Sequence, residues 1–213
     1  MEQPLCAYPE EKPIATLRTL SDKDLRDFSP TVLADHLTAT PDAPAAFSAE
    51  AKTLYYKYVA CPRIANELLT PWLSFFAKNI SKKEAARFRA APTALADMVS
   101  RMPLDTLWNP QGYCESPASA FTFGITDRKG KALLFVAMAR SLGIPARIDE
   151  VTGKVQYLAS AELLATGDEE NLPWQTVQLA AAAQSPAAPQ GTLRLAYEPR
   201  RYMENPGYYY QFT

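Results

Sequence analysis

The segment "GITDRKGKALLFVAMARSLGIPARID", residues 124–149, holds the most apolar stretch of the chain. Its middle has almost no polar side chain, so residues 129–142 are predicted to form a helix that is buried on nearly all sides. Asp127 stands just before this helix, where an aspartate is a favourable N-cap. Gly143 is suited to end the helix, and Pro145 prevents it from continuing. The chain is therefore expected to fold around this helix.

The residues before position 103 carry repeated signals that begin helices. A serine followed three residues later by an acidic residue forms a capping box, and a serine before a proline places that proline at the first helical position. Pro62 is expected to end one helix, and Pro71 to kink or split the next. Residues 1–102 are therefore predicted to be a helical N-terminal part. The start signals are Ser21 with Asp24, Ser29 with Pro30, Ser48, Ser81 with Glu84, and Pro92.

Residues 103–126 have no helical or strand periodicity, and Pro, Gly, Asn or Ser recurs every few positions. We expect a long irregular loop, which in a compact domain is usually functional. The loop carries aromatic side chains, among them Trp108 and Tyr113, that are hard to bury in irregular structure. Since aromatic residues line ligand pockets, both are candidates for contact with a peptide or a sugar.

Strand patterns follow the apolar helix. "ARIDEV" and "KVQYLA" flank Thr152-Gly153 and predict a hairpin, and residues 172–180 predict a third strand. Two more strands are expected at 192–197 and 208–213, and the last ends without a turn, as if the chain were cut from a longer protein. Helices followed by an antiparallel sheet indicate an α+β fold. We assign its core to residues 103–213, within one compact domain.

The composition excludes several function classes. The chain has 213 residues, 47% of them hydrophobic and 21% charged, with a formal net charge of -1. That balance favours a globular domain and gives no indication of a nucleic-acid partner. No apolar run reaches the roughly eighteen residues that a membrane span needs, so no membrane insertion is expected. The start of this chain lacks the apolar region of a signal peptide. The cysteines are too sparse for a disulfide framework or a zinc cluster, so no metal or cofactor is expected; they are Cys6, Cys61 and Cys114.

The stretch "ARSLGIPARI" after an apolar helix, followed by strands and then "WQTVQ", resembles the transglutaminase-like superfamily of papain-fold proteins. The resemblance covers residues 115 to 180. "YYKYVACPRIANELLTPWLSFF" is also similar to the helical segment that precedes this core in large transglutaminase-like proteins of gut bacteria. The resemblance implies a papain-like fold, with a helical N-terminal layer and a buried central helix packed on an antiparallel sheet. It also implies a bacterial parent protein that is periplasmic or at the cell surface.

In that superfamily a cysteine nucleophile opens the central helix. Its thiolate is favoured by the positive end of the helix dipole. The matching positions here hold Asp127 and Arg128, and neither side chain can act as a thiol does. Asp127 is better explained as the N-cap of the helix.

The resemblance also implies a histidine on the following strands and an aspartate just after a tryptophan strand. The strand positions offer Gln156 and Tyr157 without a histidine, and Gln178 after Trp174 stands at the aspartate position. A glutamine cannot stabilise an imidazolium as a carboxylate does. The catalytic triad is therefore absent, and these residues together with Asp127 and Arg128 become candidates for a degenerate binding site.

Two alternatives to a lost active site stay open. The single histidine of the chain, His36, would have to meet Cys114 in a relocated dyad, although a place on the surface or in helix packing explains His36 better. Asp149 and Glu150 are neighbours on a strand and so point to opposite faces, which argues against a pair of acid and base. Residues 168–170 are acidic as well and are expected to form a solvated turn.

The sequence therefore predicts a non-catalytic transglutaminase-like domain of a larger exported bacterial protein. It would bind a peptide or a glycan, or bridge neighbouring domains of that protein. The alternative is a thiol peptidase or amide-transferring enzyme that works through Cys114. A third possibility is a structural spacer without a ligand.

Overall fold

The computed structural model describes residues 11–27, 29–105 and 114–179. All of them belong to one compact unit, residues 1–182, and a second unit, residues 183–213, lies outside the described residues. The strands predicted at 192–197 and 208–213 fall in that second unit. Trp108 and Tyr113 also lie outside the described residues.

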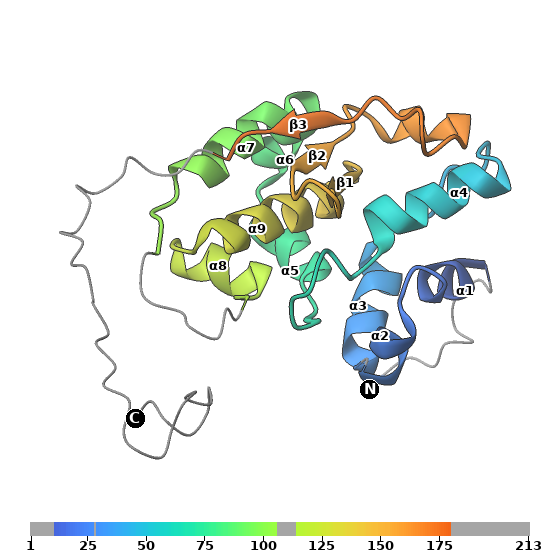
Figure 1. The fold of residues 1–213 in the computed structure, drawn as a ribbon, viewed down its shortest axis with the longest axis horizontal. Helices are drawn as coiled ribbons and strands as arrows, with labels where there is room; N and C mark the ends of the chain where they lie inside the picture. The colour runs from blue at the N-terminus through green and yellow to red at the C-terminus, as the bar shows by residue number, and fades with distance from the viewer. Residues whose placement is uncertain (1–10, 28, 106–113, 180–213) are drawn as a thin grey trace, which may run out of the picture. The chain divides into compact units, whose positions relative to one another are not determined.

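The described chain is α+β, with helices first and a small antiparallel sheet near the end (Figure 1). None of its helices is long and apolar enough to cross a lipid bilayer. The elements in chain order are α1 (Glu11–Leu17), α2 (Asp22–Asp27), α3 (Pro30–Ala39), α4 (Ala49–Tyr55), the π-helix η2 (Tyr56–Ala60), α5 (Leu73–Asn79), α6 (Lys82–Ala90), α7 (Pro92–Arg101), α8 (Pro117–Phe123), α9 (Arg128–Ser141), β1 (Ala146–Ile148), β2 (Val155–Tyr157), the 3-10 helix η3 (Ala161–Thr166) and β3 (Gln175–Val177).

The helix start signals are confirmed. The side chains of Ser29 and Ser48 accept backbone N–H groups in the first turns of α3 and α4. Ser81 and Glu84 form a complete capping box at the start of α6. Ser21 accepts the N–H of Asp24 at 3.2 Å in the same way. Each signal acts over three residues or fewer, which is why the sequence alone predicts it.

The expected helix around Pro71 is wrong in its first half. Residues 61–72 have no helix, and α5 begins only at Leu73. Proline disfavours helical geometry in the residue before it, which stops a helix from entering from that side. The free backbone N–H groups at the start of α5 find their acceptor in another helix. The Asp35 carboxylate in α3 accepts hydrogen bonds from the N–H of Leu73 at 2.9 Å and of Ser74 at 3.2 Å.

The loop predicted at 103–126 is also wrong in part, because it contains α8. Ser116 caps this helix by accepting the N–H of Ser119 at 3.1 Å, and Pro117 takes the first helical position. Gly124 ends the helix with a left-handed φ of 68°. The Ser-Pro signal is the same as that of α3, so this helix was predictable.

The hairpin and the third strand are confirmed, although each strand is shorter than predicted. The sheet is antiparallel in the order β1-β2-β3. In its register, Ile148 pairs with Val155 and Val155 with Val177, while Arg147 pairs with Gln156. Successive strand residues point to opposite faces, so the first three side chains lie on one face of the sheet and the last two on the other.

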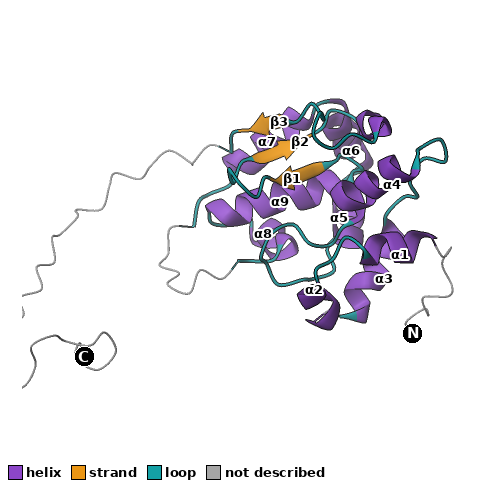
Figure 2. Cartoon of the chain, turned by 45° about the vertical axis from the view of Figure 1, so that its right-hand side comes forward, coloured by secondary structure: helices purple, strands orange, loops and turns teal. Residues whose placement is uncertain are grey.

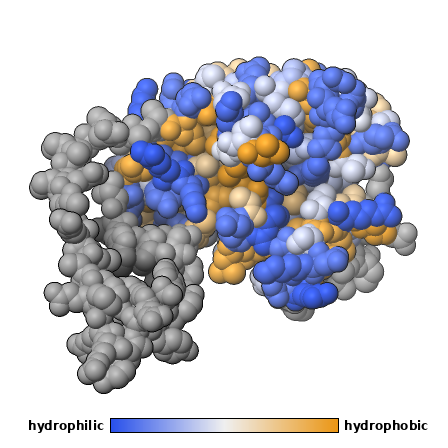
Figure 3. Space-filling view, viewed as in Figure 1, coloured by the Kyte–Doolittle hydropathy of each residue, from blue (hydrophilic) through white to orange (hydrophobic). Residues whose placement is uncertain are grey.

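The predicted burial of the central helix is confirmed. α9 packs against α5, α7 and α8 and against β1 and β2, so that helices and strands enclose it. Figure 2 shows the three strands along one side of α9 and α8 on the other. Side chains from Leu133 to Ala139 are at most 2% exposed. The space-filling view shows hydrophobic side chains in the middle of one face, among hydrophilic ones (Figure 3).

Candidate functional site

The start of α9, where the resemblance implies a nucleophile, is built for helix capping. The Asp127 carboxylate accepts the N–H of Gly130 at 2.6 Å. A Cβ on Gly130 would come within 1.8 Å of the Thr126 hydroxyl oxygen, so the glycine allows the chain to approach the helix closely. Arg128 is exposed. The first turn of α9 is therefore occupied by structural contacts.

A pocket of about 320 Å³ lies beside this turn, and we call it the Cys114 pocket. Its walls are mostly apolar, with the thiol of Cys114 3.8 Å from the Asn66 side-chain oxygen. The lining residues are Ala65, Asn66, Cys114, Arg128, Lys129, Ala132, Leu133, Ile148 and Gly153.

The sheet turns an apolar row toward the first turns of α9. This row consists of Ile148, Val155 and Val177, and all three pack against the core. Gln156, at one of the strand positions considered for the histidine, pairs with Arg147 and so lies on the opposite face. Gln178, at the position where the resemblance implies an aspartate, is exposed to solvent. The structure does not bring these two candidates to the start of α9.

Tyr157 does face α9, but as part of the core. Its ring centroid lies 6.2 Å from that of Phe135, and its hydroxyl donates to the Gln175 side chain at 2.7 Å. Burial raises the pKa of this phenol, so it stays protonated.

His36 and Cys114 are held by different neighbours. His36 is 1% exposed, and its Nδ1 lies 2.9 Å from the carbonyl oxygen of Ala60. Its ring meets that of Trp72 edge-on at 4.6 Å. Burial lowers the pKa of His36 to about 4, so the imidazole is neutral at pH 7. The sole imidazole of the chain is thus a packing residue, as expected.

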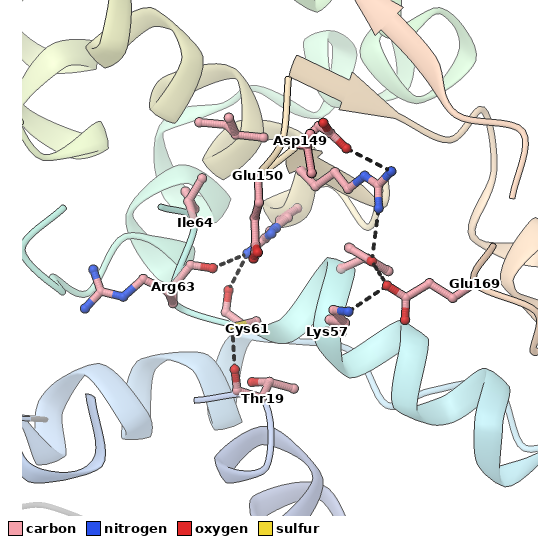
Figure 4. Close-up of a pocket in the computed structure, with 13 residues that line it drawn as sticks. Thr19, Lys57, Cys61, Arg63, Ile64, Asp149, Glu150 and Glu169 are labelled. Atoms are coloured by element: carbon pink, nitrogen blue, oxygen red, sulfur yellow. Dashed lines mark hydrogen bonds and ion pairs between the residues drawn. The ribbon is translucent and has the colours of Figure 1, made fainter. Parts of the chain in front are cut away.

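A second pocket, of about 280 Å³, lies between η2 and the β1–β2 hairpin, and we call it the Arg147 pocket (Figure 4). Unlike the Cys114 pocket, it is lined by many charged groups, which come from segments far apart in the sequence. The lining residues are Thr19, Lys57, Tyr58, Cys61, Arg63, Ile64, Arg140, Arg147, Ile148, Asp149, Glu150, Val151 and Glu169.

The Arg147 guanidinium is fixed on several sides. Its carbon lies 4.3 Å from the centroid of the Trp174 ring, a cation–π distance. Its Nε donates to Gln156 at 2.9 Å, its Nη1 donates to the Tyr58 hydroxyl at 3.3 Å, and its Nη2 lies 3.5 Å from Asp149. Two candidates from the sequence, Gln156 and Trp174, therefore meet here, where they orient an arginine that the sequence did not single out.

Glu169 completes this wall, which corrects the expectation that residues 168–170 form only a solvated turn. Its carboxylate accepts hydrogen bonds from Lys57 at 2.6 Å and from the Tyr58 hydroxyl, as Figure 4 shows for Lys57. Burial works to raise the pKa of Glu169, but the hydrogen bonds from Lys57 and Tyr58 outweigh it and lower this pKa. The carboxylate therefore stays ionised and acts as an ion-pair partner. Asp168 and Glu170 are exposed, as predicted.

Arg140, in the last turn of α9, forms the buried floor of the Arg147 pocket. It is 4% exposed and donates to three carbonyl oxygens: Nε to Ala146 at 3.0 Å, and Nη1 to Cys61 at 2.8 Å and Arg63 at 2.7 Å. The only signal in the sequence is a charged residue inside an apolar helix, which implies a buried partner.

Comparisons with protein-family models, with curated proteins and with solved structures found no match for this chain.

Proposed function

We propose that this chain is a non-catalytic, transglutaminase-like domain of a larger exported bacterial protein and that it binds a peptide or a glycan in the Arg147 pocket. The observation that carries the proposal is the distribution of polar groups around β1. On the face of the sheet toward the start of α9, the row of Ile148, Val155 and Val177 offers no polar side chain. On the opposite face, Arg147 donates a hydrogen bond to Gln156 and lines a pocket.

The geometry of Arg147 suits recognition more than reaction. A guanidinium already held by Trp174, Gln156 and Asp149 loses little conformational entropy when a ligand binds. Its planar donors and the neighbouring aromatic ring are groups that contact the polar and flat parts of peptides and sugars.

The alternative, a thiol enzyme working through Cys114, lacks a residue that could act as its general base. Nucleophilic catalysis by cysteine needs a group that accepts the thiol proton. The only histidine, His36, is buried against Ala60 and Trp72, whereas Cys114 contacts Asn66.

Nuclear magnetic resonance titration tests the proposal directly. Amide resonances of this chain are followed while pools of short peptides and of oligosaccharides are added. We expect shifts at residues 57–64 and 147–151, and at least a tenfold loss of affinity in Arg147→Ala, equal to about 1.4 kcal/mol. Arg128→Ala, an exposed arginine of the Cys114 pocket, is the matched control and should bind as the unmodified chain does.

Two outcomes contradict the proposal. One is turnover, seen as a change in the mass of an added peptide. The other is a set of ligand shifts confined to residues around Cys114 and Arg128, with none near Arg147.

A further inference from the structure

One nitrogen of the buried Arg140 guanidinium makes no hydrogen bond within the described chain. The three hydrogen bonds of Arg140 to carbonyl groups use Nε and Nη1, so that nitrogen is Nη2. Arg140 is 4% exposed and lines the Arg147 pocket. Since the other two nitrogens are bonded to carbonyl groups, Nη2 is the donor of this arginine that is left for a ligand in the pocket.

Arg140 makes no direct ion pair within the described chain, and the buried carboxylate of Glu67 acts on it only without contact. Lys57 is paired with Glu169 at 2.6 Å and Arg147 with Asp149 at 3.5 Å. Arg63, the fourth cation of the lining, pairs with Asp24. Arg140 contacts only carbonyl oxygens among the described residues. A buried cation without a direct ion pair is unfavourable, so an incoming carboxylate that contacts Arg140 is favoured there.

The outer edge of β1 runs along the same pocket. The backbone N–H of Asp149 donates to the carbonyl oxygen of Lys154, and the carbonyl oxygen of Pro145 accepts from the N–H of Leu158. The backbone groups of the odd-numbered residues in this strand therefore point toward β2. By the alternation of an antiparallel ladder, Ile148 directs its backbone N–H and C=O away from β2, toward the unpaired edge. Ile148 lines the pocket, and the carbonyl of Ala146, two residues earlier, is bonded to Arg140.

We propose that the Arg147 pocket binds the free C-terminal carboxylate of a peptide, with Arg140 Nη2 donating to that carboxylate and the edge at Ile148 pairing with the peptide backbone. This proposal rests on the proposed function, and it favours a peptide over a glycan because an unpaired strand edge recognises a main chain. Glu150 is exposed at the rim and, in Figure 4, its side chain points into the pocket above Cys61 and Arg63. Its negative charge opposes the carboxylate and so weakens binding.

The test compares matched ligands on the unmodified protein. A pool of N-acetylated tripeptides with free carboxylates is titrated beside the same pool with C-terminal amides, and trigalacturonic acid supplies a carboxylate on a sugar. We expect the acid pool to shift the amides of residues 147–150 and the Nε–H of Arg140. The amide pool should bind at least about tenfold more weakly, since it lacks the charge that Arg140 requires.

Variants sharpen the test without removing the buried arginine, whose loss would leave three carbonyl groups without a donor. Glu150→Gln should bind the acid pool about threefold more tightly and leave the amide pool unchanged, because it removes repulsion at the rim. Arg128→Gln is the control and should change neither.

Equal binding of acid and amide peptides overturns the inference, and so does binding of the sugar acid in place of the peptides. Both of these results leave the proposed function intact. If no peptide or oligosaccharide shifts residues of the Arg147 pocket, the proposed function and this inference both fail.

Discussion

The Cys114 pocket and the Arg147 pocket are lined by consecutive residues of one segment, Ala65 and Asn66 in the first and Arg63 and Ile64 in the second, and they share Ile148. Their chemistry nevertheless differs. The first has mostly apolar walls, whereas the second has four cations and three carboxylates in its lining: Lys57, Arg63, Arg140, Arg147, Asp149, Glu150 and Glu169.

The difference follows from the alternation of a strand. Ile148 and Val155 face α9 and belong to its core, so polar groups at these positions would be buried beside a hydrophobic helix. Arg147 and Gln156, one residue away, face outward and are free of that constraint. A binding site on the outward face of the sheet therefore does not depend on reactive residues on the face toward α9.

The largest effect is expected at the support that both pockets share. Phe135→Ala should lower the free energy of unfolding by about 3–5 kcal/mol, because the side chain is fully buried in α9 and its removal leaves a cavity. Urea denaturation measures this change. Val151→Ala, at a position that is 93% exposed, is the control and should stay within about 0.5 kcal/mol. A loss below 1 kcal/mol in Phe135→Ala, on the scale of an exposed site, would show that α9 is not the common support.

Gly130→Ala tests how tightly the start of α9 is packed on the side of the Cys114 pocket. Alanine normally stabilises a helix interior by about 0.5–1 kcal/mol relative to glycine. Here the new Cβ would overlap the buried Thr126 side chain, so we expect a destabilisation of about 1–3 kcal/mol by chemical denaturation. Lys129→Ala, at an exposed position of the same turn, is the matched control. Stabilisation by Gly130→Ala would mean that this turn has room for a side chain and, with it, for a ligand.

The pH dependence of stability tests whether His36 is available as a base for Cys114. Its folded-state pKa of about 4 lies below its usual value of 6.5, so the unfolded chain binds the proton more readily between these values. Stability should therefore fall as the pH drops from 7 to 5, by about 1–2 kcal/mol for this one group. The measurement is urea denaturation at both pH values.

His36→Leu is the comparison for that measurement, and in this variant the change between pH 7 and pH 5 should be smaller by that amount. If the two proteins show the same change, or if the His36 imidazole titrates near 6.5, the ring is exposed and the Cys114 pocket regains a candidate base.

The smallest effect is expected at the thiol itself. Cys114→Ala should leave peptide cleavage and amide transfer at the level of a blank without protein, because no imidazole adjoins the thiol. The assay is mass spectrometry of peptide substrates and of a thiol-directed peptide probe. Stoichiometric labelling of the unmodified chain, abolished in Cys114→Ala, would move the function from the Arg147 pocket to the Cys114 pocket.

Much of the fold and part of the site were open to prediction. The apolar pattern of 129–142 predicted a buried helix, and α9 confirms it. The hairpin followed from its strand residues and Gly153, whose φ of 67° suits glycine. The sequence also identified Gln156 and Trp174 as candidates, although their common partner, Arg147, was missed because they were matched to a catalytic arrangement.

What the sequence determined by itself is local: helix starts at Ser48 and Ser81, the N-cap at Asp127, and the alternation of the strands. These features depend on backbone groups within a few positions, so a short pattern contains all their causes. Only the tertiary structure decided that Arg140 reaches the carbonyl of Cys61 and that Glu169 meets Tyr58, contacts between residues separated by 79 and 111 positions. These contacts form because α9 and the sheet pack together and bring distant residues side by side. A local pattern of charged residues cannot predict which of them will meet.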